Sequence, residues 1–222
     1  MNPASNLTEI KSNIPPHVKL VAVSKFHPKE TVAEVYNAGQ RVFGESRVQE
    51  LDAKQAQLPS DIEWHLIGHL QTNKIKVIMP YIHTIQSVDS WKLLQEINKY
   101  ASRINRRINC LLEIHIAKEE SKFGFTFDSC REMLENEEWK GLGHITITGL
   151  MGMATYTDDT DVVRSEFRAL KHFFDEIKGK YFNQDIQFRE LSMGMSHDYR
   201  IAIEEGSTIV RIGTSIFGER EY

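Results

Sequence analysis

Short runs of consecutive apolar residues alternate along the chain with longer stretches in which apolar residues recur every three or four positions. The run at residues 20–25 holds four successive apolar residues, which is typical of a strand covered on both faces. Eight such segments are predicted strands: residues 20–25, 41–44, 63–68, 83–88, 109–115, 146–151, 187–193 and 208–212. Strands that alternate with helices pair in parallel, so the pattern predicts an α/β fold.

The stretches between these strands carry helix signals. In PKETVAEVYNAG, residues 28–39, the proline suits a first helical turn and the final glycine suits a C-terminal cap. In SWKLLQEINKYASRI, residues 90–104, Leu94, Ile97 and Ala101 share one face. Eight strand and helix units predict a closed (β/α)8 barrel, the TIM barrel, with an open doubly wound sheet as the alternative.

Composition supports one globular domain over residues 1–222, with residues 1–17 as an N-terminal extension expected to form a helix beneath the barrel. A formal net charge of -4 disfavours a nucleic-acid partner. The first residues lack the apolar core of a signal peptide, and no run approaches the roughly 20 apolar residues of a membrane span. We therefore expect a cytoplasmic monomer that does not bind membranes.

Lys25 closes the first apolar run and is the first candidate for chemistry. Strand side chains alternate, so Lys25 shares a face with Val21 and Val23; if these point inward, its amine points into the barrel mouth. Partial desolvation lowers the pKa of a lysine and leaves an amine that can form a Schiff base with a carbonyl. The alternative is a solvated loop lysine.

The loops after the seventh and eighth strands form the second candidate, because TIM barrels commonly bind phosphate there. Gly194 and Gly213 allow the backbone to approach a ligand closely, and Ser196 and Thr214 offer hydroxyl groups. A helix expected to begin near Ser196 would direct N-H groups at an anion. An ordinary helix cap explains Ser196 equally well, so phosphate binding rests on both loops carrying the same signature.

Arg211 lies within the last predicted strand, two residues before Gly213, and therefore points inward if Gly213 does. A buried guanidinium needs an acceptor. That acceptor is either a carboxylate, for which Glu45 and Glu113 are candidates, or an atom of a ligand.

Histidines and cysteines do not predict a metal site. His65 and His69 are four residues apart, but on a strand and its following loop this spacing separates them too widely for shared metal coordination. Cys110 and Cys130 lie far apart without a CxxC motif, so both are expected to be buried thiols.

Several motifs together resemble one family. The stretches VAVSK, VFGES, WHLIGHLQTNK, SKFGF, GLMGM, SMGMSHD and STIVRIGTSIFG are similar to those of the YggS/PROSC family of pyridoxal phosphate homeostasis proteins, over nearly all of residues 21–218. The resemblance implies the barrel found in the N-terminal domain of alanine racemases. It also implies pyridoxal 5'-phosphate (PLP) as the cofactor.

Site residues follow from the same resemblance. Lys25 matches the lysine that holds the cofactor as a Schiff base, and Arg211 matches the arginine near the pyridine nitrogen. Where the family usually has Asn, this chain has Ser46, whose shorter side chain puts the expected ring contact in doubt. The cofactor-binding residues implied are Lys25, Ser46, Ser192, Gly194, Ser196, Arg211, Gly213 and Thr214.

The function implied is PLP homeostasis by storage, buffering or delivery, with PLP-dependent apoenzymes as possible recipients. A racemase or lyase of narrow scope is the first alternative, and a Schiff-base aldolase is the second. An arginine at the pyridine nitrogen opposes its protonation and weakens the ring as an electron sink. The chain ends four residues after the last motif, so a second domain carrying an opposing base is not expected.

Overall fold

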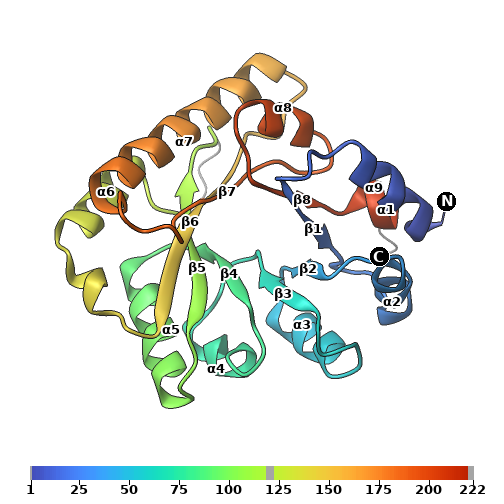
Figure 1. Cartoon of the computed structure of the whole chain (residues 1–222), viewed down its shortest axis with the longest axis horizontal. Coiled ribbons are helices and arrows are strands. Elements are labelled where there is room, and N and C mark those ends of the chain that lie inside the picture. The colour runs from blue at the N-terminus through green and yellow to red at the C-terminus, as the bar shows by residue number, and fades with distance from the viewer. Residues whose placement is uncertain (1, 119–122, 220–222) are drawn as a thin grey trace.

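Eight parallel strands close into a barrel at the centre of the molecule (Figure 1). The computed structural model describes residues 2–118 and 123–219. Neighbouring strands pair in chain order, and β8 pairs with β1 to complete the ring. The strands are β1 (Lys19–Val23), β2 (Val42–Glu45), β3 (Glu63–Leu66), β4 (Thr84–Val88), β5 (Ile108–His115), β6 (Ile145–Met153), β7 (Glu190–Ser192) and β8 (Ile209–Ile212). The predicted TIM barrel is confirmed, which excludes the open sheet.

Helices form an outer ring around the strands (Figure 1). They are α1 (Pro3–Ser12), α2 (Lys29–Asn37), α3 (Val48–Gln55), α4 (Ile75–Ile78), α5 (Trp91–Arg103), α6 (Phe127–Glu135), α7 (Thr160–Tyr181), α8 (Tyr199–Glu204) and α9 (Thr214–Phe217), with short 3-10 helices η1 (Thr72–Lys74) and η2 (Glu138–Gly141). None of the helices in the described residues is both long and apolar enough to cross a membrane.

Apolar side chains form two separate clusters because strand residues point alternately into and out of the barrel. A small interior cluster consists of Val21, Leu111, Met151 and Ile209. A much larger cluster fills the layer between the strands and the helices. The inward position of Val21 confirms the face assigned to β1 from the sequence.

Three predicted details differ from the structure. The strand β1 ends at Val23, so Lys25 lies in the following loop. The helix expected near Ser196 begins at Tyr199, because the Asp198 carboxylate accepts a hydrogen bond from the backbone N-H of Met195 and holds the preceding residues in a turn.

The third difference concerns the N-terminal extension. Helix α1 packs against α2 and α9 in the outer ring and does not lie beneath the barrel (Figure 1). The amide of Asn6 donates a 3.0 Å hydrogen bond to the carbonyl of Ile216 in α9. Leu7 and Ile10 are buried in the same helix, so α1 is attached by both polar and apolar contacts.

Candidate functional site at the C-terminal ends of the strands

A cavity of about 620 Å³ lies at the C-terminal ends of β1 and β8, the end of a barrel where ligands bind. Six of the eight predicted site residues line it. These are Lys25, Ser46, Ser196, Arg211, Gly213 and Thr214. The cavity also contacts Tyr156, whose side chain is 80% exposed, so it opens to solvent.

The loop that carries Lys25 is held by hydrogen bonds to β2 and α3. The hydroxyl of Ser24 donates to Glu45 at 2.6 Å, and its backbone N-H donates to the carbonyl of Gly44. Phe26 has a φ of 68°, a left-handed conformation that is unusual for a bulky residue, and its N-H donates to the Glu50 carboxylate at 2.6 Å. These contacts fix the backbone on both sides of Lys25.

Lys54 in α3 binds the same loop and the two carboxylates that hold it. Its ammonium donates to the carbonyl of Ser24, to Glu45 and to Glu50, each at 2.7 Å. Burial raises the pKa of Glu45 to about 7, although the ammonium of Lys54 opposes this rise. The anchoring role of Lys54 and Glu50 was not predicted from the sequence, although their i,i+4 spacing on a helix signals an ion pair.

Arg211 points into the barrel from β8 and forms one wall of the cavity. Its guanidinium donates to the hydroxyl of Ser192 at 2.6 Å and to the carbonyl of Gly152 at 2.9 Å. Burial lowers the pKa of Arg211, whereas the charges of Asp198 and Glu113 oppose that shift.

The two carboxylates proposed for Arg211 are therefore placed differently. Glu45 binds Lys54 and Ser24, whereas Glu113 acts on Arg211 only through its charge. Within residues 2–118 and 123–219, no carboxylate forms an ion pair with Arg211. The cavity is the side from which a ligand acceptor can reach its guanidinium.

The loops after β7 and β8 meet at Ser196. Its hydroxyl oxygen accepts hydrogen bonds from the backbone N-H groups of Gly213 at 3.2 Å and Ser215 at 3.5 Å. A Cβ atom at Gly213 would lie 3.1 Å from the carbonyl oxygen of Val23, so this glycine allows β8 to approach β1 closely. Hydroxyl and N-H groups thus gather on one side of the cavity, as an anion requires.

Ser192 and Gly194 lie behind this cavity and do not line it. Gly194 has a φ of 97°, and a Cβ atom there would lie 2.6 Å from that of Ala202 in α8. Its carbonyl accepts a hydrogen bond from the backbone N-H of Arg211. Ser192 is fully buried and contacts the guanidinium of Arg211. Both residues are placed to support Arg211, and their direct contact with a ligand stays a prediction.

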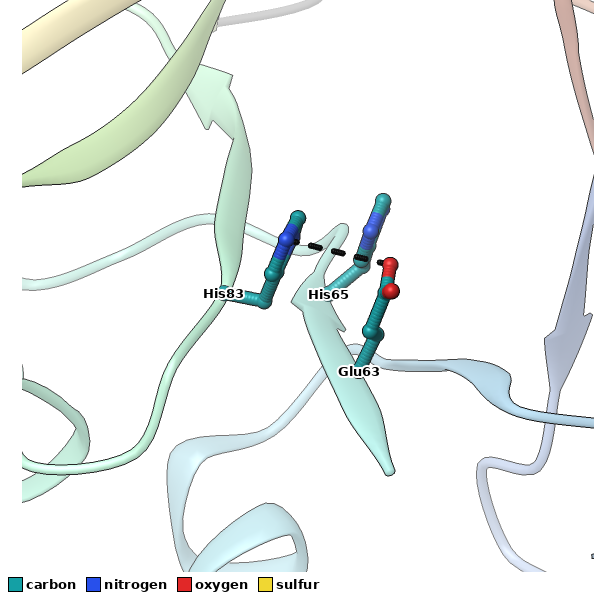
Figure 2. A group of neighbouring side chains, drawn as sticks. All are labelled: Glu63, His65 and His83. Carbon is teal, nitrogen blue, oxygen red and sulfur yellow. Dashed lines mark ion pairs between the residues drawn. The ribbon is translucent and has the colours of Figure 1, made fainter. Parts of the chain in front are cut away.

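A second polar cluster lies at the opposite end of the barrel, where Glu63, His65 and His83 border a cavity of about 360 Å³. Figure 2 shows the two rings edge-on, with a centroid separation of 5.7 Å and an angle of 4° between their planes. A ring nitrogen binds a metal along a lone pair in the ring plane, and two nearly parallel planes do not meet at a shared ion. A shared metal would require rotation of at least one ring, and Nδ1 of His65 contacts Gln86 while Nδ1 of His83 contacts Thr84, each at 2.8 Å.

His69 is separate from this cluster. It lies in the loop after β3, where its Nδ1 contacts Asp89 at 2.8 Å and its ring stacks on Phe123. The four-residue spacing of His65 and His69 therefore places them in different surroundings. Cys110 and Cys130 are both buried free thiols, as expected from the sequence.

Comparison with known proteins places this geometry in a family. The family model described as "Alanine racemase, N-terminal domain" matches residues 2–221. The chain is 42% identical to the pyridoxal phosphate homeostasis protein of Aquifex aeolicus, over 92% of this chain and 88% of that one. It is 37% identical to the human protein of the same name, over 92% and 77% of the two chains.

Solved structures of similar proteins have the same fold. PipY of Synechococcus elongatus, determined with PLP bound, superimposes with a TM-score of 0.88 at 36% identity and covers 97% of this chain and 100% of that one. An alanine racemase of Clostridium difficile has a TM-score of 0.75 at 16% identity and is covered over 56% of its length. At that identity the racemase shows only a shared fold.

Proposed function

The chain belongs to the family of the alanine racemase N-terminal domain, with the pyridoxal phosphate homeostasis proteins as relatives, and we propose that it binds PLP in the cavity at the C-terminal ends of its strands. One observation carries the proposal. A lysine, an arginine and a group of hydroxyl and N-H donors face a single cavity of about 620 Å³, which is an ordinary size for a cofactor site.

Each part of the cavity has a role in this proposal. Lys25 forms the Schiff base, because it lines the cavity and its loop is fixed on both sides by the hydrogen bonds of Ser24 and Phe26. Ser196 and Thr214 receive the phosphate with nearby backbone N-H groups. Arg211 is proposed to face the pyridine nitrogen, and Ser46 lines the same cavity. Bound PLP supplies an aldehyde that a lysine can capture and release reversibly.

We propose storage and delivery of PLP in the cytoplasm as the biological role, with PLP-dependent apoenzymes as recipients and the monomer as the working form. The solvent-exposed Tyr156 at the rim supports exchange, because a cavity that opens to water allows ligand to enter and leave. This openness is unfavourable for carbanion chemistry, which benefits from excluding water.

The substitution Lys25→Ala tests the site. We expect the purified variant to lose the visible absorbance band of a PLP Schiff base and to release PLP on dialysis, because the amine that captures the aldehyde is gone. The matched control is Lys19→Ala, which removes a lysine at the other end of β1, beside the opposite cavity. Borohydride reduction followed by peptide mapping should label Lys25 in the unmodified protein. A yellow Lys25→Ala protein labelled at another lysine would show that the assignment is wrong.

A racemase is the second candidate, because Tyr156 and His197 both line the cavity with ring centroids 5.0 Å apart. Either residue could serve as a second base opposite Lys25. Incubation of D- and L-alanine in heavy water distinguishes the two functions. A carrier leaves the alpha hydrogen in place over hours, whereas a racemase exchanges it with inversion and loses that activity in Tyr156→Phe or His197→Ala.

A further inference from the structure

A chain of hydrogen bonds crosses the interior of the barrel from Arg211 toward the opposite end. Arg211 donates to the hydroxyl of Ser192 at 2.6 Å, and this hydroxyl donates to Oε1 of Gln86 at 2.7 Å. Nε2 of Gln86 then contacts Nδ1 of His65 at 2.8 Å. The four side chains come from β8, β7, β4 and β3, and each is at most 4% exposed.

The direction of every bond in this chain is set by Arg211. A guanidinium only donates, so the oxygen of Ser192 accepts and its single proton goes to Oε1 of Gln86. The amide nitrogen of Gln86 therefore faces His65 and donates to Nδ1. His65 must then be neutral and carry its proton on Nε2, the ring nitrogen that does not contact Gln86.

The surroundings of His65 agree with this neutral state. Burial, together with the nearby His83 and Lys19, holds the pKa of His65 well below its usual value. Within the described parts of the chain, Nε2 of His65 has no hydrogen-bond partner and is buried beside Glu63 and His83. A cation or second proton on His65 would place two donors face to face at Gln86 and disrupt the chain.

We propose that Gln86 and His65 are positioning residues for Arg211, which hold the Ser192 hydroxyl, and through it the guanidinium, in one orientation toward the cavity. This inference rests on the proposed function, in which Arg211 faces the pyridine nitrogen of PLP. Burying these polar atoms costs desolvation free energy. In return, hydrogen bonds with one donor direction hold the four side chains in a single arrangement, which an apolar interior would not do. Neither Gln86 nor His65 lines the cavity itself.

Two substitutions interrupt the chain of hydrogen bonds from Arg211 to His65, and one preserves it. Gln86→Met keeps the length of the side chain but removes both hydrogen bonds, and His65→Leu removes the acceptor of Gln86. His65→Asn keeps an acceptor where Nδ1 lies, because the amide oxygen of Asn occupies a similar position. The control is Thr84→Val, which alters a hydroxyl bonded to His83 and leaves the chain intact.

The first measurement uses PLP-loaded protein. We expect Gln86→Met and His65→Leu to shift the absorbance maximum of the bound cofactor, make it dependent on pH, and weaken PLP retention about tenfold. His65→Asn and Thr84→Val should stay within about twofold of the unmodified protein. Thermal unfolding followed by circular dichroism identifies any variant that has lost its fold.

The second measurement needs no cofactor. Nitrogen-15 NMR of the PLP-free protein should show His65 with its proton on Nε2, and Gln86→Met should abolish this preference and speed proton exchange at the Arg211 guanidinium. A proton on Nδ1 of His65, or a folded Gln86→Met protein with an unchanged cofactor spectrum, would overturn the inference. A protein that never binds PLP but shows the Nε2 proton and a Gln86-dependent Arg211 signal would instead contradict the proposed function.

Discussion

Two lysines near the cavity illustrate how surroundings set the role of a residue. Lys25 faces the cavity, whereas Lys54 is buried and donates to three acceptors at 2.7 Å. Three acceptors match the three donors of an ammonium group, so Lys54 is held as a structural cation. In the proposed function Lys25 is therefore the reactive lysine, and the buried Lys54 keeps its loop in place.

At the scale of single residues, we expect the hydroxyl groups of Ser196 and Thr214 to contribute separately to PLP retention. We expect Ser196→Ala combined with Thr214→Val to weaken PLP retention more than either change alone, because each removes a hydroxyl group that we propose binds the phosphate. Each loss should cost about 1.5 to 3 kcal/mol of binding free energy, measured by equilibrium dialysis.

The control for this pair is Thr148→Val, which removes a hydroxyl at the opposite cavity. Ser196 also accepts hydrogen bonds from the N-H groups of Gly213 and Ser215, so part of its effect comes from the loop. Unchanged retention in the double variant would place the phosphate elsewhere.

At the scale of elements, β6 contains a position that only glycine can occupy. Gly149 pairs with Glu190 of β7, and a Cβ atom at Gly149 would lie 1.7 Å from the carbonyl oxygen of Glu190. The pairing of β5 and β6 is irregular beside it, between Cys110 and Leu111, which is typical of a β-bulge. The close approach of β6 and β7 therefore depends on the missing side chain.

Gly149→Ala should lower the free energy of unfolding by at least about 3 kcal/mol, because the backbone of β6 or β7 must move. The measurement is urea denaturation followed by circular dichroism. Gly179→Ala is the matched control, since Gly179 lies on the exposed side of α7 and a Cβ atom there would have no neighbouring atom within 4 Å. That change should stabilise the protein by about 0.5 to 1 kcal/mol. Equal effects of the two changes would contradict the steric argument.

The elements were largely predictable because their signals are local. Apolar runs identified all eight strands, and Arg211 could be placed by counting along β8. The end of β1 and the start of α8 were not predictable in this way, since the carboxylates of Glu45 and Asp198 accept hydrogen bonds that shape those loops. The contact of Ser192 with Gln86 joins residues 106 positions apart and has no signature in the sequence.

At the scale of the whole molecule, burial of acidic groups links stability to pH. Glu113 is buried near Asp89 and Arg211, and burial raises its pKa from an ordinary 4.5 to about 7, with a further rise from Asp89 and an opposing effect of Arg211. A raised pKa means that the folded state holds the proton more tightly than the unfolded chain. The stability that results is fully present below pH 4.5 and is lost as the pH rises through about 7.

Glu113→Gln should remove the part of this dependence that comes from Glu113, whereas Glu45, whose pKa burial also raises to about 7, retains its own part. We expect the variant to match the unmodified protein near pH 4.5 and to exceed its free energy of unfolding above pH 7 by up to about 3 kcal/mol. Denaturation curves across this range provide the measurement, with Glu132→Gln on the exposed side of α6 as the control. A Glu113→Gln protein with an unchanged pH profile would show that Glu113 is ionised throughout.

The pairing of β8 with β1 brings the first and last strands of the barrel together, and the cavity is divided between them. Lys25 leaves the ribosome early, whereas Arg211, Gly213 and Thr214 are among the last barrel residues to be synthesised. A nascent chain that lacks β8 has one half of the cavity and an unpaired β1 edge. Under the proposed function, ligand capture therefore requires that β8 has been synthesised and has paired with β1.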